Sequence, residues 1–209
     1  MSDAPVVFLD VDTQRDFLLA EGALAVPGGL AVVPIIQKLA SYAFVHGVPV
    51  VSSVDSHPPD DPEFARFPPH CVRGTRGQLK IEGTTLGNAL VVPNVAGDGP
   101  DAAAIVEARQ IMIEKQTLAV FDNPHAEGIF RVLAPRLIVA FGVATDYAVL
   151  EDVVAVCARG YRTAVVSDAI VGLSVRGSQE ALREMRRAGA TFITAAEVLS
   201  KADPAQLTW

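Results

Sequence analysis

Short apolar runs recur along the chain, and each is closed by a polar residue or by glycine or proline. Polar residues do not alternate within these runs, so both faces of each run are apolar. This pattern is typical of strands in a parallel sheet that is covered on both faces. We expect strands within residues 6–9, 48–54, 111–113, 137–143, 163–166 and 191–193.

Stretches with apolar residues at helical spacing lie between these strands. They cover residues 29–46, 145–159 and 177–188, and each is followed by glycine, which commonly ends a helix. The alternation predicts an α/β fold: a three-layer α/β/α, Rossmann-like domain with a doubly wound, mostly parallel sheet. We expect one domain over residues 1–209, in which residues 74–100, rich in glycine and proline, form an elaborated loop.

Several polar residues directly follow the expected strands, where doubly wound sheets bind their ligands. Asp10 and Asp12 would point to one face if the first strand continued through them, and such close carboxylates raise each other's pKa. We expect Asp12, nearer the open end, to transfer protons. Asp10 is expected to support it or to close the strand by bonding loop amides. The other candidates at strand ends are Asp55, Lys115, Thr145, Asp146 and Asp168.

The loop after the second expected strand combines two imidazoles with two carboxylates. In DSHPPDDPEFARFPPH, Asp55 and His57 form an Asp-x-His pair, Glu63 follows six residues later, and His70 lies seven beyond that. Mixed nitrogen and oxygen ligands of this kind hold divalent metal ions. The alternative is a solvated loop in which Asp55 caps a turn.

Two further positions near strand ends are candidates for catalysis. Lys115 ends an apolar strand, where its ammonium needs a carboxylate partner, and Asp12 is a natural one; the alternative is a surface lysine. The helix expected to start at Thr145 or Asp146 has unpaired N–H groups at the positive end of its dipole, which suit an oxyanion. An ordinary helix cap is the alternative there.

Composition narrows the class of partner. The chain has 209 residues, half of them apolar, and its 17 Lys and Arg against 24 Asp and Glu give a net charge of −7. This charge argues against nucleic acid or an anionic membrane surface and favours a small molecule. No basic leader precedes the first strand and no apolar run approaches the length of a membrane span, so we expect a cytoplasmic protein. Cys71 and Cys157 are expected to be free thiols.

The order of four motifs resembles one known family. DTQRDF, the DSH…PEF…FPPHCVRGT loop, the EK that closes a strand, and GVATDYAV followed by VVSDAI are similar to the nicotinamidase group of the isochorismatase-like cysteine hydrolases. The resemblance runs in order from about residue 5 to residue 200. It implies an isochorismatase-like fold, a small amide substrate such as nicotinamide, and a homo-oligomer.

The resemblance also implies roles for individual residues. A divalent metal ion, zinc with iron or manganese as alternatives, would be held by Asp55, His57, Glu63 and His70, and in nicotinamidases this ion anchors the pyridine nitrogen of the substrate. Asp12 and Lys115 match the family's catalytic pair, and backbone amides around a cis peptide between Val143 and Ala144 match its oxyanion hole. We expect Phe17, Phe121 and Tyr147 to line the substrate pocket, with plain core positions as the alternative for each.

The nucleophile position departs from the family, because Ala148 stands where the family has cysteine. A methyl group cannot form a thioester, and neither Cys71, in the loop, nor Cys157, about two and a half helical turns further on, replaces it. Three interpretations remain: an amidase whose cysteine has been replaced and which is inactive as written, a natural ligand-binding relative, or an isochorismatase-type vinyl-ether hydrolase. The last type generally lacks the metal ligands that this chain keeps.

Overall fold

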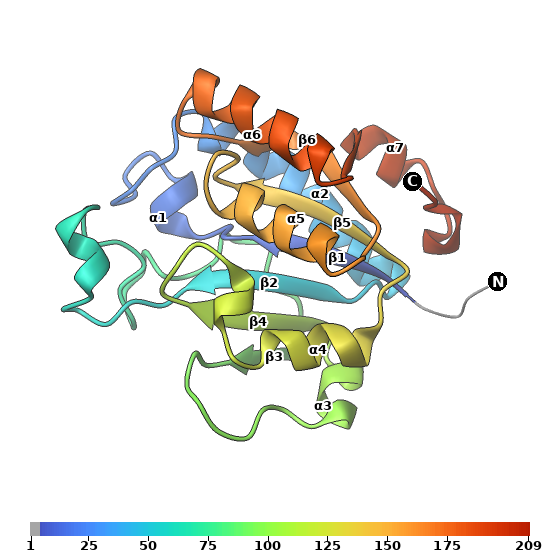
Figure 1. Ribbon diagram of the computed structural model, residues 1–209, viewed down its shortest axis with the longest axis horizontal. Coiled ribbons are helices and arrows are strands. Elements are labelled where there is room, and N and C mark those ends of the chain that lie inside the picture. The colour runs from blue at the N-terminus through green and yellow to red at the C-terminus, as the bar shows by residue number, and fades with distance from the viewer. Residues whose placement is uncertain (1–4) are drawn as a thin grey trace.

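Seven parallel strands form one sheet at the centre of the protein, in the order β3-β4-β2-β1-β5-β6-β7 (Figure 1). The computed structural model describes residues 5–209. The strands are β1 (Val6–Val11), β2 (Val50–Asp55), β3 (Ala89–Val92), β4 (Gln110–Lys115), β5 (Leu137–Val143), β6 (Thr163–Val171) and β7 (Thr191–Ile193). The α/β fold class with a doubly wound parallel sheet is therefore confirmed.

Helices cover both faces of this sheet, as the apolar runs predict. The helices are α1 (Arg15–Leu18), α2 (Gly29–His46), α3 (Ala102–Glu107), α4 (Ala126–Leu133), α5 (Ala148–Ala158), α6 (Val175–Arg187) and α7 (Ala195–Leu199). One apolar core joins α1, α2 and α7 to one face, and a second joins α3, α4, α5 and α6 to the other. The central strands β1, β2 and β5 are buried along their whole length, which explains why they do not alternate.

Helix α2 has the bounds that its apolar spacing predicts, because it lies between Gly28 and Gly47, which both adopt left-handed backbone angles. Its mean hydropathy of 1.3 over 18 residues makes it long and apolar enough to cross a membrane by length and composition alone. The expectation that no apolar stretch reaches this length was wrong. In the structure α2 packs against β5, β6 and α7 as a core helix.

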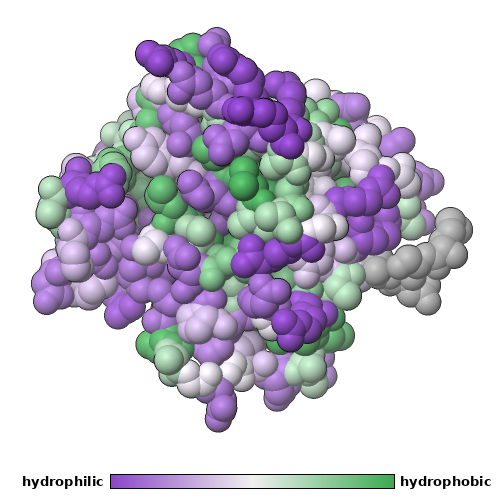
Figure 2. All heavy atoms as spheres, in the orientation of Figure 1, coloured by the Kyte–Doolittle hydropathy of each residue, from purple (hydrophilic) through white to green (hydrophobic). Residues whose placement is uncertain are grey.

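Helices α5 and α6 begin at residues other than those expected. Helix α5 starts at Ala148, because Asp146 does not cap it: the Asp146 carboxylate accepts hydrogen bonds from the backbone N–H groups of Leu173 and Ser174. Helix α6 starts earlier, because the Ser174 hydroxyl caps it by accepting from Gly177 N–H. The outer face of α6, at the top of Figure 2, is hydrophilic.

Strand β3 was not expected, and it lies inside the segment predicted to be an elaborated loop. It pairs with β4 alone, at the edge of the sheet, and Val91 is 52% exposed. An edge strand of four residues followed by Pro93 leaves a weak pattern in the sequence. The short helices α1, α3, α4 and α7 were also missed, because helices of four to eight residues show little periodicity.

Candidate active site

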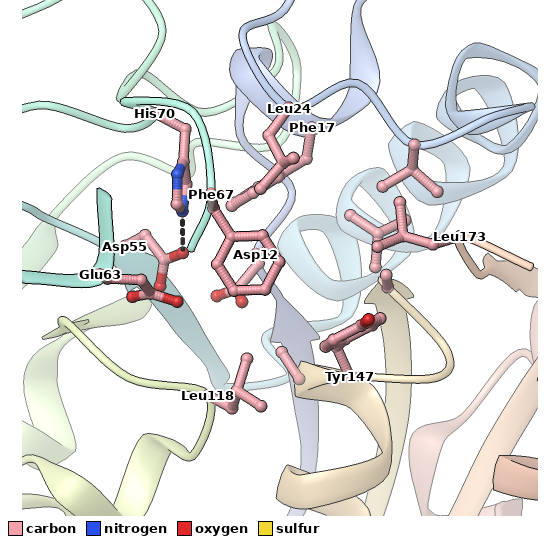
Figure 3. A pocket seen from close by; sticks show the side chains of 14 residues that line it. Asp12, Phe17, Leu24, Asp55, Glu63, Phe67, His70, Leu118, Tyr147 and Leu173 are labelled. Carbon is pink, nitrogen blue, oxygen red and sulfur yellow. Dashed lines mark ion pairs between the residues drawn. The ribbon is translucent and has the colours of Figure 1, made fainter. Parts of the chain in front are cut away.

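The carboxyl ends of three neighbouring strands bring the catalytic candidates together, and Figure 3 shows two of them, Asp12 and Asp55. Asp12 follows β1, Asp55 ends β2, and Lys115 ends β4 directly opposite Asp55 in the pairing register. Parallel strands end at the same edge of a sheet, so residues far apart in sequence meet there without any special loop. The expected site at this edge is therefore formed by the strand order itself.

Lys115 forms a buried ion-pair cluster with two carboxylates. Its Nζ lies 2.8 Å from Asp12 Oδ2 and 2.5 Å from Asp55 Oδ1, and the lysine is completely buried. It is therefore not a surface lysine. Such a cluster is stable only when each charge has a partner, since an isolated buried charge is costly.

Burial and charge set the protonation of this cluster. Burial raises the pKa of Asp12 to about 6, although Lys115 acts to lower it and Asp55 raises it further. For Asp55, burial also acts to raise the pKa, but Lys115 and hydrogen bonds with His57 and His70 outweigh it and keep the pKa well below its usual range. Burial acts to lower the pKa of Lys115, but Asp12 and Asp55 raise it above the usual value. At neutral pH Asp12 is thus a carboxylate that can accept a proton.

The four predicted metal ligands lie on one side of Asp12. Asp55 Oδ2 is 3.6 Å from His57 Nε2 and 3.6 Å from His70 Nε2, and Glu63 Oε2 is 3.7 Å from His57 Nε2. Ligand atoms bound to one zinc ion at about 2.0–2.2 Å would be separated by roughly 3–3.6 Å. Both ring nitrogens of His57 are buried and make no hydrogen bond among the described residues, and Nε2 is the one that faces Asp55 and Glu63. The donor types, the spacing and this unpaired nitrogen fit a divalent ion.

The other nitrogen of each imidazole lies close to an oxygen atom. His57 Nδ1 lies 3.0 Å from Asp61 Oδ2, and His70 Nδ1 lies 2.8 Å from the carbonyl oxygen of Pro68. These contacts turn each Nε2 toward Asp55 and favour the tautomer that leaves Nε2 free to bind a metal. Asp61 was missed in the sequence, although its spacing of four residues from His57 was visible.

Asp61 also shapes the loop that carries Glu63. Its Oδ1 accepts a hydrogen bond from Glu63 N–H at 2.9 Å and caps a short 3-10 helix, Pro62–Ala65. Gln14 fixes the start of the same loop, because its side chain accepts from Asp55 N–H and donates to Asp55 C=O. Three of the candidate ligands therefore lie on a loop that is anchored at its start and at Asp61, with Asp55 at the end of β2, and not on the solvated loop of the alternative interpretation.

An apolar pocket opens beside these polar groups. Polar groups from Asp12, Asp55, Glu63 and His70 line one side. Figure 3 shows these facing Phe67, Tyr147 and Leu173. The remaining lining residues are Phe17, Leu24, Val26, Leu118, Val143, Ala144 and Ala148. A pocket with one polar and one apolar side suits a small, flat molecule with a polar substituent.

Not every residue expected in the pocket lies there. Phe17 and Tyr147 line it, but Phe121 does not. Phe121 packs on Phe130 with ring centroids 5.1 Å apart, and the guanidinium of Arg159 lies 3.6 Å from its ring centroid. It belongs to the core under α4 and α5, because the turn after β4 directs it away from the site. Phe67, from the metal-ligand loop, takes the aromatic position instead.

Ala148, which the family resemblance matches to the nucleophile, lines the pocket as the first residue of α5. Ala148 is 3% exposed and follows the turn that contains the cis peptide between Val143 and Ala144. Cys71 and Cys157 are both free thiols, as expected, and neither lines the pocket. Burial raises the pKa of the Cys71 thiol above its usual value, so this cysteine is not an activated nucleophile.

Asp10 and Asp12 face opposite sides of the sheet, contrary to the expectation that they share a face. Asp10 accepts hydrogen bonds from Ser52 and Lys80, whereas Asp12 accepts one from Ser53, and adjacent residues on β2 point to opposite faces. Strand β1 ends at Val11, and Asp12 has a positive φ of 49°, which turns its side chain. Asp10 is thus a structural carboxylate, neutralised by Lys80.

Comparisons with known proteins identify the family and the fold. Residues 6–197 match the family model of the isochorismatase domain. The chain is 27% identical over 219 residues to the nicotinamidase of Escherichia coli (strain K12), covering 92% of this chain and 96% of that protein.

Solved structures of related proteins share the fold. The pyrazinamidase of Pyrococcus horikoshii in complex with zinc has a TM-score of 0.74 at 24% identity, over 90% of this chain and 98% of that one. The pyrazinamidase/nicotinamidase from Streptococcus mutans UA159 has a TM-score of 0.71 at 25% identity, over 90% and 99%. Since the family model spans nearly the whole sequence, the chain belongs to the isochorismatase family of hydrolases.

Proposed function

We propose that this protein has the metal-dependent amide site of a nicotinamidase, with Ala148 at the position of the nucleophile. Asp55, His57, Glu63 and His70 would hold a divalent ion, zinc in the first instance, and the apolar pocket would bind nicotinamide or a related small amide. The observation that carries this proposal is the convergence of the Asp12–Lys115 pair and two oriented imidazoles on one pocket.

The residues present have distinct roles in this proposal. Asp12, whose pKa is raised to about 6 by burial, accepts a proton at neutral pH. Lys115 holds Asp12 Oδ2 in place and compensates the negative charge of Asp12. Asp55 also contacts Lys115, which links the metal ligands to the proton acceptor. The bound ion would supply a Lewis acid that anchors a ring nitrogen of the substrate. The apolar wall of Phe17, Phe67 and Tyr147 would exclude water from the ring.

The missing step is covalent. A thiol at the start of α5 gives its proton to Asp12 and attacks the carbonyl carbon of the amide, the C–N bond breaks as Asp12 returns that proton to the leaving ammonia, and water then hydrolyses the thioester to the carboxylic acid and the free thiol. Ala148 offers no atom for this bond, so the chain as written would bind amides without hydrolysing them. Replacing Ala148 by cysteine restores the one group that the mechanism lacks.

The test is the Ala148→Cys variant, loaded with zinc and assayed for ammonia release from nicotinamide and a panel of small amides. We expect release from the variant, none above background from the unmodified protein, and none from Ala148→Cys combined with Asp12→Asn. Ala148→Ser is the matched control for side-chain size. Failure of Ala148→Cys on every amide, with metal bound and the fold intact, would refute the amidase assignment.

A second candidate function is favoured by the alanine at position 148, which has no thiol. A vinyl-ether hydrolase of the isochorismatase type needs a proton donor and no covalent nucleophile, and a raised pKa equips Asp12 to donate. In that case the unmodified protein would cleave a vinyl ether such as isochorismate, and Asp12→Asn would abolish the cleavage. Nicotinamide binding that depends on the metal, without any vinyl-ether cleavage, favours the first candidate.

A further inference from the structure

The carboxylate of Asp16 joins two segments that line the candidate site, and it has no role in the function proposed above. Asp16 lies on α1, next to Phe17, and is partly buried. Its Oδ2 accepts a hydrogen bond of 2.7 Å from the backbone N–H of Cys71. Its Oδ1 accepts one of 3.1 Å from the backbone N–H of Ala23. Because both donors are backbone groups, the carboxylate fixes the course of both segments.

The contact with Cys71 reaches both histidines of the proposed metal site. Cys71 directly follows His70, and its carbonyl oxygen accepts a hydrogen bond of 3.2 Å from the backbone N–H of His57. Cys71 also has a positive φ of 45°, which is uncommon for a residue other than glycine and has to be held by surrounding contacts. Asp16 therefore anchors the backbone where the two segments that carry imidazoles meet.

The contact with Ala23 holds part of the apolar wall of the pocket. Ala23 precedes Leu24, which lines the pocket together with Val26 (Figure 3). Leu24 N–H donates to the carbonyl oxygen of Asp16 at 3.1 Å, and Val26 N–H donates to that of Phe17 at 2.8 Å. The backbone and the side chain of Asp16 thus hold the same stretch of wall in place.

A glycine leaves the space that this carboxylate occupies. A Cβ atom on Gly77 would overlap the carboxylate of Asp16, and Asp16 N–H donates to the carbonyl oxygen of Gly77 at 3.1 Å. The φ of Gly77 lies outside the left-handed region, so the close approach of Asp16, and not the backbone angle, explains this glycine. The carboxylate is therefore confined from a third side.

We propose that Asp16 is a positioning residue that couples the metal side of the pocket to its apolar wall, with one carboxylate oxygen on Cys71 and the other on Ala23. An ion that orders the loop of residues 56–80 would then also order the wall segment, residues 19–28. A small amide would bind more tightly to the ordered wall even where it does not touch the ion. Linkage requires the reverse effect, so the amide would raise metal affinity by the same factor. The inference rests on the proposed function, in which the pocket takes an ion and an amide.

Two variants remove the coupling in different ways. Asp16→Asn keeps the shape of the side chain but has one acceptor oxygen, so it can accept from Cys71 or from Ala23 and not from both. Gly77→Ala keeps the carboxylate but displaces it, because the added methyl group overlaps it. Glu21→Gln is the matched control, since it removes a carboxylate from an exposed position of the wall segment.

The first measurement is hydrogen exchange followed by mass spectrometry, with and without zinc, and it requires no amide. In the unmodified protein and in Glu21→Gln, we expect zinc to slow exchange in the wall segment about fivefold or more, although this segment contains no proposed ligand. In Asp16→Asn and Gly77→Ala, we expect zinc to slow exchange in residues 56–80 alone. A purely structural Asp16 would instead change exchange in the wall segment by the same amount with and without zinc.

The second measurement is the affinity for benzamide, which has the amide group of nicotinamide but no ring nitrogen for an ion to anchor. We expect zinc to raise this affinity about fivefold or more in the unmodified protein and less than about twofold in Asp16→Asn. Competition with a chromophoric chelator should show that benzamide raises zinc affinity by the same factor. An effect of zinc on benzamide that survives in Asp16→Asn would mean direct contact with the ion and would overturn the coupling.

The exchange experiment has equally clear contrary outcomes. A wall segment that does not respond to zinc in the unmodified protein, or that responds equally in Asp16→Asn, would overturn the proposal. If Asp16→Asn does not fold, Gly77→Ala decides. Failure of the proposed function would appear as absent ammonia release from Ala148→Cys, or as absent amide binding, and the exchange in residues 19–28 would still decide the role of Asp16.

Discussion

At the scale of single residues, the site depends on buried charges that compensate one another. Lys115 is the only cation in contact with Asp12 and Asp55 among the described residues. Each of these residues directly follows an apolar run, so the sequence predicted their place. Asp152 was not predicted, because a charged residue inside a helical pattern reads as part of a solvated face, and only the packing of α5 on the sheet buries it.

Removing the buried cation should destabilise the protein strongly. Lys115→Met retains the length of the side chain but removes the ammonium from two buried carboxylates, of which Asp55 keeps only its contacts with His57 and His70, so we expect a loss of about 3–5 kcal/mol in the free energy of unfolding at pH 7. The loss should shrink as the pH falls toward about 6 and then level off, because without Lys115 the pKa of Asp12 lies higher and the variant takes up a proton first. Chemical denaturation measures both effects. Lys38→Met, at an exposed position of α2, is the control, and an equal effect there would contradict the argument.

The protonation of Asp152 predicts a particular pH dependence of stability. Its pKa rises from 3.8 to about 8 on folding, so the unfolded chain releases this proton first. The stability contributed by the neutral acid is complete below about pH 4 and is lost as the pH rises toward 8. Asp152→Asn should therefore gain stability over the unmodified protein across this window, by up to about 1.4 kcal/mol per pH unit. Denaturation curves at several pH values measure the gain. A constant difference, as expected for the exposed Asp98→Asn, would contradict it.

At the scale of elements, prediction succeeded where the local pattern and the tertiary packing agree. The bounds of α2 follow from its apolar spacing and its flanking glycines, and the central strands follow from their unbroken apolar runs. Prediction failed for β3, whose single neighbour leaves Val91 exposed, and for Phe121, whose direction depends on the turn after β4. The candidate metal ligands could be singled out in the sequence because they lie close together in the chain, whereas Asp61 was overlooked because its contact with His57 depends on how the loop folds back.

Asp61 should control metal affinity through the loop rather than by binding the metal itself. It contacts His57 Nδ1 and caps the turn that carries Glu63. Loss of a carboxylate that orients a ligating histidine typically lowers metal affinity roughly 10- to 100-fold. We expect a loss of this size for Asp61→Ala, and a smaller one for Asp61→Asn, which keeps the cap. Competition with a chromophoric chelator measures the affinity. Asp60→Ala, at the exposed neighbouring position, should change nothing, and an equal loss there would contradict the role of Asp61.

At the scale of the whole molecule, the sheet and the loop that contains three of the proposed metal ligands differ in what stabilises them. The sheet is enclosed between two apolar cores, whereas residues 56–80 have little regular structure and contribute few residues to either core. A bound metal ion would stabilise the segments that contribute its ligands. Because only Asp55 is on a strand, the ion would stabilise mainly the loop. Metal removal should therefore loosen the loop without unfolding the protein.

Hydrogen exchange followed by mass spectrometry tests this division. After chelation we expect faster exchange in peptides covering residues 56–80 and unchanged exchange in β1 and β5, which pair with each other at the centre of the sheet. Addition of zinc should restore the slower exchange, and the His57→Ala variant should resemble the chelated protein whether or not zinc is present. Uniformly faster exchange across β1 and β5 would mean that the ion supports the whole fold. Unchanged exchange in the loop would mean that these side chains hold no ion, because binding free energy gained by the folded loop has to appear as protection there.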